Sequence, residues 1–363
     1  MSEPIYLHFQ RDEDGELQLP RQCVLFGFDY EAEEEVGQAV AGTLEQILYG
    51  LSVAGMDLRS LDGITLASDC RSAAMALQQL PEGQVPLEMS EQDDVMEAGR
   101  TVAVRRENEL RFHIVLRAGL GLMTLSPEKE QQTLAYACIA HEAAHVDHEG
   151  HLYRRFPGAY STPLECGERS RQTFLKAMDV WSEYAACRSS AMYRPEAVEE
   201  FEGIFCRSLE ASFSACKERI AAFREDRNLT AKVFRDIQQL FGDVFIHAGY
   251  FLGHLDGMEW KLEKDAPRAS ALLHEYPKIE ALFLRLHRVL HELWLTEYAW
   301  ESLEVFASIY DLICEMMALH GLVFARHEAE WRMVMTDDEE AIPEMHDALA
   351  KLMARPGKVS TGG

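Results

Sequence analysis

The most constraining feature of this chain is the string HEAAH at residues 141–145. On an α-helix, residues four positions apart project from nearly the same face, so His141 and His145 would place two imidazoles within reach of one metal ion. Catalytic zinc takes three protein ligands and keeps one position open. Glu142 is one step round the helix, where it would act as general base on an activated water. The string therefore predicts a zinc-dependent hydrolytic site.

The string needs context, because with 14 histidines and 61 acidic residues among 363 it arises by chance in roughly one such chain in twenty. Ser126-Pro127-Glu128 has the composition of a helix start, and residues 134–145 are small, apolar and helix-forming. Gly150 is expected to end this helix. Two histidines and a glutamate on a buried helix are costly unless they are paired, which favours a metal site over an ordinary helix.

Two residues are candidates for the third metal ligand. Glu183 lies in a second predicted helix, where small neighbours such as Ala186 would let the two helices approach closely. His151 is the alternative, because HEAAHVDHEGH has the histidine spacing of the pattern HExxHxxGxxH. His148 occupies the glycine position of that pattern, and a histidine would resist the sharp turn required there. These arguments favour Glu183 and leave His151 open.

An HExxH string followed some tens of residues later by a helical glutamate resembles the gluzincin group of zinc metallopeptidases. The resemblance covers residues 127–191. It implies one Zn²⁺ per chain, with His141, His145 and Glu183 as its ligands, and it implies Glu142 as the catalytic base.

The chain departs from that group at one position. Many gluzincins carry an aspartate four residues after the ligand glutamate, and here that position is Cys187. Asp179, one turn before Glu183, is a candidate to orient a ligand imidazole in its place. With His151 as ligand the chain would instead resemble the metzincins, and residues 190–193 are loosely similar to their methionine-containing turn.

Strand and helix patterns alternate before the HExxH string, and helical patterns dominate after it. Two β-like runs, 101–104 and 110–116, predict a hairpin shortly before the HExxH helix. Nearly all of residues 196–353 has helical periodicity. The predicted fold class is α+β: a zincin-like catalytic domain, with a mixed sheet and the HExxH helix, followed by a mostly α-helical C-terminal part.

The expected organisation has four parts. They are an N-terminal α/β portion with strands leading to the active-site cleft (1–125), a zinc-binding helical core (126–194), an α-helical C-terminal domain (195–354) and a disordered tail (355–363).

The net charge of −26 argues against a nucleic-acid partner and against an anionic membrane surface. The eight cysteines show no CxxC spacing and indicate reduced thiols. The chain begins without a signal-peptide pattern and has no apolar run of membrane-spanning length. We therefore expect a cytoplasmic protein with a peptide or protein substrate, no nucleic acid and no membrane. The C-terminal helices are a candidate surface for a protein partner.

The combined prediction is a cytoplasmic zinc metallopeptidase that cleaves a peptide bond with Glu142 as general base. The alternative is a catalytically narrow or inactive zincin-like protein with a regulatory or partner-binding role. Hydrolysis also needs a donor for the tetrahedral oxyanion. The sequence offers several donors near the HExxH string without ranking them: His148, His151, Tyr153, Tyr160, Tyr184 and Arg188.

Overall fold

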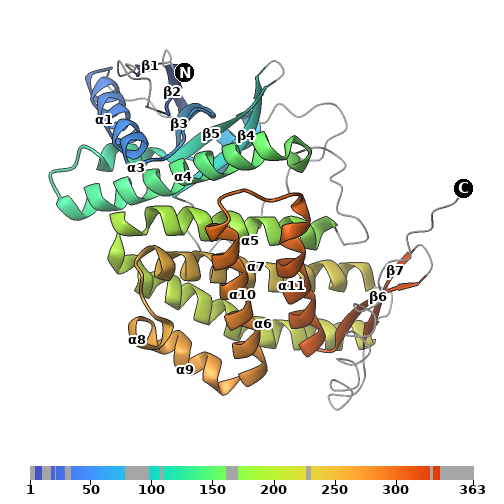
Figure 1. Ribbon diagram of the computed structural model, residues 1–363. Helices are drawn as coiled ribbons and strands as arrows, with labels where there is room; N and C mark the ends of the chain where they lie inside the picture. The colour runs from blue at the N-terminus through green and yellow to red at the C-terminus, as the bar shows by residue number, and fades with distance from the viewer. Residues whose placement is uncertain are drawn as a thin grey trace, which may run out of the picture.

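The fold is α+β, as expected, with a five-stranded mixed sheet followed by layers of helices (Figure 1). The computed structural model describes residues 5–9, 18–20, 22–28, 34–77, 98–106, 109–160, 171–225, 230–327 and 330–335. Within these residues, no helix has both the length and the apolar character needed to cross a membrane.

The sheet has the strand order β1-β2-β3-β5-β4. Its strands are β1 (Ile5–His8), β2 (Gln22–Phe28), β3 (Leu61–Ala67), β4 (Gly99–Arg106) and β5 (Glu109–Arg117). The β2–β3 and β3–β5 pairs are parallel, whereas β1 and β4 pair antiparallel at the two edges. Parallel neighbours need a crossover, and α1 (Glu34–Val53) supplies it between β2 and β3. The predicted hairpin is confirmed as β4–β5, and β4 is an edge strand.

Helices cover both faces of the sheet. One face carries α1, α3 (Ala118–Met123) and α4 (Lys129–Arg155), and α2 (Cys70–Leu77) lies on the other. Side chains alternate along a strand, so Val102 and Val104 of β4 join a small core with α2, while Thr101 faces α4. The edge strand therefore borders the helix that carries the HExxH string.

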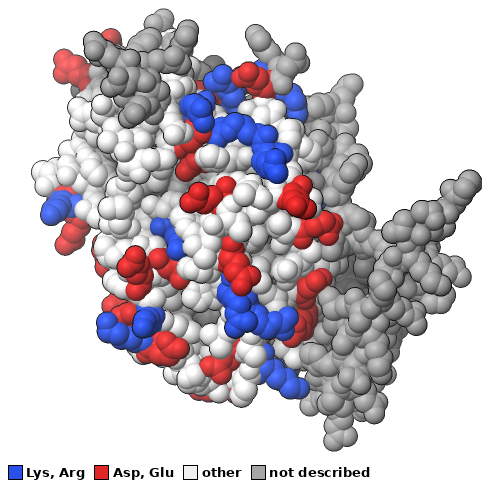
Figure 2. All heavy atoms as spheres, viewed as in Figure 1, with Lys and Arg blue, Asp and Glu red and all other residues white. Residues whose placement is uncertain are grey.

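The HExxH helix is longer than predicted, because Gly150 does not end it. A glycine stops a helix by taking a positive φ, and among the described glycines only Gly55 and Gly321 do so. Gly150 instead allows close packing, since a Cβ there would come 2.9 Å from Ser60 Oγ. One turn later, Arg154 donates to Asp57 at 2.6 Å. This contact ties α4 to the loop before β3. Figure 2 shows one face of the molecule, on which basic and acidic side chains are interspersed.

The remaining helices enclose the larger of the cores. They are α5 (Arg171–Ser190), α6 (Val198–Glu225), α7 (Thr230–Gly257), α8 (Leu262–Asp265), α9 (Pro267–Glu275), α10 (Pro277–Leu295) and α11 (Ala307–Leu319), with short 3₁₀ turns at Pro157–Tyr160, Ala191–Tyr193, Pro195–Ala197 and Leu303–Phe306. In Figure 1, α5 lies directly below α4, and α7 lies beside α5.

The prediction that nearly all of residues 196–353 is helical is wrong at one place. After α11, β6 (Leu322–His327) and β7 (Glu330–Met335) form an antiparallel hairpin. Gly321, with φ +82°, turns the chain out of α11. The helix expected at 343–353 and the tail at 355–363 lie outside the described residues.

Glycines let α7 pack closely against α5. A Cβ at Gly249 would come 2.7 Å from the backbone oxygen of Val180, and Cβ atoms at Gly253 and Gly257 would be closer still to the α5 backbone. Because these glycines recur every four residues, they form one face of α7. This contact brings Tyr250 of α7 toward Glu183 of α5.

Candidate metal centre

Three predicted ligand residues meet at the interface between α4 and α5. Glu183 Oε2 lies 3.4 Å from His141 Nε2 and 3.3 Å from His145 Nε2. The two Nε2 atoms are 3.1 Å apart. In the described part of the chain, this is the one group of three or more His, Cys, Asp or Glu residues whose ligand atoms could share a metal ion.

The geometry and chemistry of these three residues fit zinc. Tetrahedral ligands about 2.1 Å from a zinc ion lie about 3.4 Å from one another, close to the separations found here. Glu183 Oε2 is buried and has no hydrogen-bond partner among the described residues. Buried carboxylate oxygens are rarely left without a partner, and a cation between Glu183 and the histidines would supply one.

The electrostatics link the same three residues. Burial alone would raise the pKa of Glu183, but His145 and His141 hold it well below its usual range. Burial alone would lower the pKa of both histidines, but Glu183 raises it above the ordinary value. Metal ligands must be deprotonated, so metal binding here would displace protons from the imidazoles.

Glu142 turns toward the edge strand β4. The Thr101 hydroxyl lies 2.9 Å from Glu142 Oε2 and 3.0 Å from the Glu142 backbone oxygen. A Cβ at Gly99 would come 3.0 Å from Glu142 Cγ and 3.2 Å from Oε1, so the glycine leaves room for the carboxylate. Glu142 is buried, and it is close enough to His141 and His145 to help raise the pKa of both. The predicted base therefore lies beside the predicted ligands.

Each of the two predicted ligand histidines has a partner for its second nitrogen. His145 Nδ1 lies 3.0 Å from Ser182 Oγ, and His141 Nδ1 lies 3.8 Å from Cys187 Sγ. Cys187 thus lies beside the His141 imidazole, at the position where the gluzincin pattern has an aspartate. Ser182 is the residue that contacts His145 Nδ1, and burial raises the pKa of Asp179, the residue considered from sequence, to about 6.

His151 lies away from the three ligand atoms. Its side chain is 40 % exposed, and its Nε2 is 3.3 Å from Asp147 Oδ1. Its ring stacks on Tyr298, with centroids 5.0 Å apart. Because α4 stays helical past Gly150, the chain makes no turn that would bring His151 back to His141 and His145. The geometry therefore favours Glu183 as the third ligand.

Tyr250 of α7 is a site residue that the sequence analysis missed. Its ring stacks on that of His141, with centroids 5.8 Å and planes 20° apart. Its hydroxyl lies beside the Glu183 carboxylate, and burial together with the Glu183 charge raises its pKa well above the ordinary value. The glycine at 249 and the four-residue glycine spacing after it were the sequence signal for a close helix contact here.

Most of the donors considered from sequence are engaged elsewhere. His148 contacts the Tyr298 hydroxyl and Ser189 Oγ, and Tyr160 donates to Glu149. Tyr184 and Arg188 both donate to Asp256 of α7. Tyr250 is thus the better-placed hydroxyl donor at the three-ligand group.

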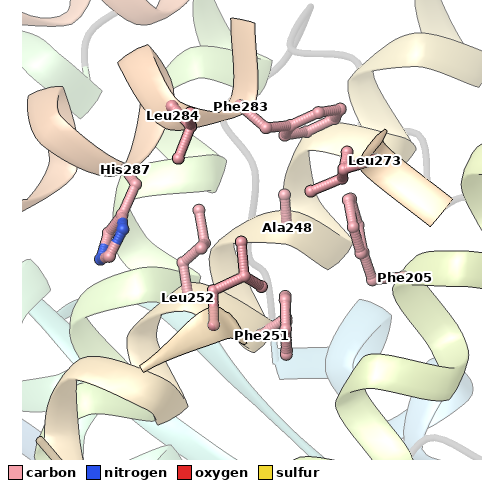
Figure 3. A pocket seen from close by; sticks show the side chains of 9 residues that line it. Phe205, Ala248, Phe251, Leu252, Leu273, Phe283, Leu284 and His287 are labelled. Carbon is pink, nitrogen blue, oxygen red and sulfur yellow. The ribbon is translucent and has the colours of Figure 1, made fainter. Parts of the chain in front are cut away.

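A separate hollow lies among α6, α7, α9 and α10 (Figure 3). Its lining is apolar apart from His287. Ala248 and Leu252 line it and lie on the face of α7 opposite Tyr250. With a single polar side chain, this hollow offers little chemistry, so the α4–α5 interface remains the candidate site.

No protein-family model, curated protein or solved structure matches this chain. The residues and geometry of the α4–α5 interface are therefore the evidence for what this chain does.

Proposed function

We propose that this chain is a zinc-dependent hydrolase of the metallopeptidase type, with His141, His145 and Glu183 as metal ligands and Glu142 as general base. The observation that carries the proposal is the triangle of ligand atoms, 3.1–3.4 Å on each side, with a buried glutamate next to it. The gluzincin resemblance of residues 127–191 points to the same four residues.

The side chains around the triangle have distinct tasks in this proposal. A bound zinc ion would lower the pKa of water toward neutrality and polarise a substrate carbonyl. Glu142 accepts the proton of the attacking water and delivers it to the leaving amine. Thr101 holds one oxygen of the Glu142 carboxylate, which leaves the other for proton transfer.

Tyr250 is suited to stabilise the developing oxyanion. Burial first, and then the nearby Glu183 charge, keep its pKa well above the ordinary value, so the phenol stays protonated and can donate a hydrogen bond. Its stacking on His141 and the close approach of α7 to α5 hold the ring in place. In this proposal the hydroxyl turns from the Glu183 carboxylate to the substrate.

The edge strand supports a peptide as substrate. Among the described strands, β4 pairs only with β5, so its other edge can accept an extended peptide as an added strand. Thr101 on β4 contacts the proposed base. A peptide paired with β4 would therefore run past Glu142. The seven described cysteines are free thiols, which supports the cytoplasmic location proposed for this hydrolase.

The test is Glu142→Gln. Glutamine keeps the volume and can still accept from Thr101, but it cannot take a proton from water. We expect turnover of an unfolded protein such as casein to fall by about 10²–10⁴-fold, while zinc content is unchanged. Undiminished turnover in this variant, after removal of contaminating proteases, would contradict the mechanism.

The second candidate is a catalytically narrow or inactive zincin-like regulator. Limited exposure favours it, because the side chains of His141, His145 and Glu183 are only 18 %, 11 % and 19 % exposed. Zinc binding without cleavage of casein would select this candidate. The C-terminal helices are then the proposed surface for its protein partner.

A further inference from the structure

The two ring nitrogens of His145 are both contacted by α5, through consecutive residues. Glu183 Oε2 lies 3.3 Å from Nε2, and Ser182 Oγ lies 3.0 Å from Nδ1. A neutral imidazole carries its proton on one nitrogen and offers a lone pair on the other. His145 can therefore offer Nε2 to a metal only when its proton is on Nδ1.

The Ser182 hydroxyl is oriented by a carboxylate. Ser182 donates to Glu149 Oε1 at 2.8 Å. A serine has a single hydroxyl proton, so when it donates to Glu149 its oxygen must accept from His145 Nδ1–H. The direction of the chain of hydrogen bonds is then His145 to Ser182 to Glu149, which is the direction that frees Nε2.

The other oxygen of Glu149 is occupied as well. The Tyr160 hydroxyl donates to Glu149 Oε2. The Tyr160 ring packs edge-on against Phe112 of β5 and Tyr153 of α4, with centroids 5.7 Å and 5.9 Å away. The Tyr160 and Ser182 hydroxyls thus donate to the two oxygens of Glu149, and aromatic packing against the sheet and α4 fixes this end of the hydrogen-bond chain.

We propose that Ser182 and Glu149 are positioning residues, which hold His145 in the tautomer and orientation that bind the metal. Tyr160 donates to Glu149 and completes this chain of hydrogen bonds from His145 through Ser182, which we call the relay. The inference rests on the proposed metal site and adds residues to it. Glu149 is four positions after His145, so His141, His145 and Glu149 share one face of α4, and the working pattern is HExxHxxxE.

The second ligand histidine provides an internal comparison. His141 Nδ1 faces Cys187 Sγ at 3.8 Å, and sulfur is a weak acceptor. The relay on His145 should therefore contribute more to metal affinity than the contact between His141 and Cys187. Cys187→Ala is accordingly the comparison variant, because it removes the weaker of the two contacts and leaves Ser182 and Glu149 in place.

The experiment measures the zinc dissociation constant of the full chain by competition with a chelator. Removing a hydrogen-bond partner of a ligand histidine typically weakens zinc binding about 10–100-fold, and we expect this of Ser182→Ala. Ser182→Thr keeps the hydroxyl and should restore affinity. Glu149→Leu should resemble Ser182→Ala, and Glu149→Gln, which can still accept from Ser182, should lose less. Cys187→Ala removes the weaker partner of His141 and should therefore weaken zinc binding less than Ser182→Ala does.

A second readout separates positioning from general stability. In the zinc-loaded wild type, ¹⁵N NMR should detect a protected Nδ1–H on His145. Ser182→Ala should lose that protection and Ser182→Thr should keep it, with melting temperatures of the zinc-free proteins matched. Zinc affinity and Nδ1–H protection unchanged in Ser182→Ala would overturn the inference while leaving the proposed function standing. A wild type that takes up no zinc would overturn both.

Discussion

The Thr101 hydroxyl on edge strand β4 lies 2.9 Å from Glu142 Oε2 on α4. This contact joins the sheet to the helix that carries both proposed histidine ligands. It holds the proposed base by a side chain that the alternation of β4 directs toward α4. The sheet therefore has a direct part in the site, besides supporting the helix.

The contact predicts the effect of Thr101→Val, which preserves shape and removes the hydroxyl. A hydrogen bond to a charged group contributes about 1.5–3 kcal/mol, so turnover should fall about 10–100-fold. Zinc content should stay the same, because Thr101 contacts no proposed ligand. Thr101→Ser, assayed beside it, should retain most of the activity. Unchanged turnover in the valine variant would show that the base does not depend on β4.

Tyr250→Phe tests the oxyanion role. The phenylalanine ring can still stack on His141, but the donor is lost. Loss of one such donor typically lowers kcat about 10²–10³-fold, with little effect on KM, and zinc should remain bound. Steady-state kinetics together with metal analysis would check this. If Tyr250→Phe loses zinc, the Tyr250 hydroxyl supports Glu183 as a ligand and does not act in the reaction.

Gly253→Ala tests the close contact of α7 with α5. The new Cβ would meet the backbone of Tyr184, which cannot move aside as a flexible side chain would. We expect a loss of about 1–3 kcal/mol in the free energy of unfolding, measured with urea. Gly42→Ala in α1 is the control: a Cβ there meets nothing within 4 Å, and the change should stabilise by about 0.5–1 kcal/mol. Equal effects of the two substitutions would argue against the close packing.

Acid should destabilise the fold through His148. Burial lowers the pKa of His148 to about 4, from an ordinary value of 6.5. The unfolded chain therefore binds a proton below pH 6.5, whereas the folded chain does so only near pH 4. The stability that this group contributes is complete above pH 6.5 and is lost as the pH falls toward 4, by about 3 kcal/mol.

The check is the free energy of unfolding as a function of pH, for the wild type and His148→Gln. Between pH 6.5 and 4 the variant should lose less stability than the wild type. Part of the pH dependence of the unfolding free energy should remain in the variant, because burial also lowers the pKa of His320 to about 4. Parallel curves for the two proteins would mean that His148 is protonated in the fold near its ordinary pKa.

Local patterns predicted the parts of the site that depend on a single element. The four-residue spacing of His141 and His145 places both on one face of any helix, and alternation in residues 101–116 sufficed for the β4–β5 hairpin. Gly150 was misleading, because a glycine permits either a helix end or a close contact, and the neighbour that decides this, Ser60, is distant in sequence.

Tyr250 and Glu149, whose places in the site depend on how helices pack, were not predicted. Tyr250 reaches the site because glycines of α7 lie against α5, and periodicity within α7 does not say which helix that face will meet. Glu149 was on the predicted helix, on the same face as His141 and His145. Its role required knowledge that Ser182 lies between it and His145.

The most direct test of the proposed site is the metal content of the purified protein, measured for the wild type, Glu183→Ala and His151→Ala. The proposal predicts one zinc per chain in the wild type, loss of zinc in Glu183→Ala and retention in His151→Ala. Zinc lost only from His151→Ala would contradict the assignment of Glu183. A wild type without zinc, which takes up none when it is added, would contradict the metal centre itself.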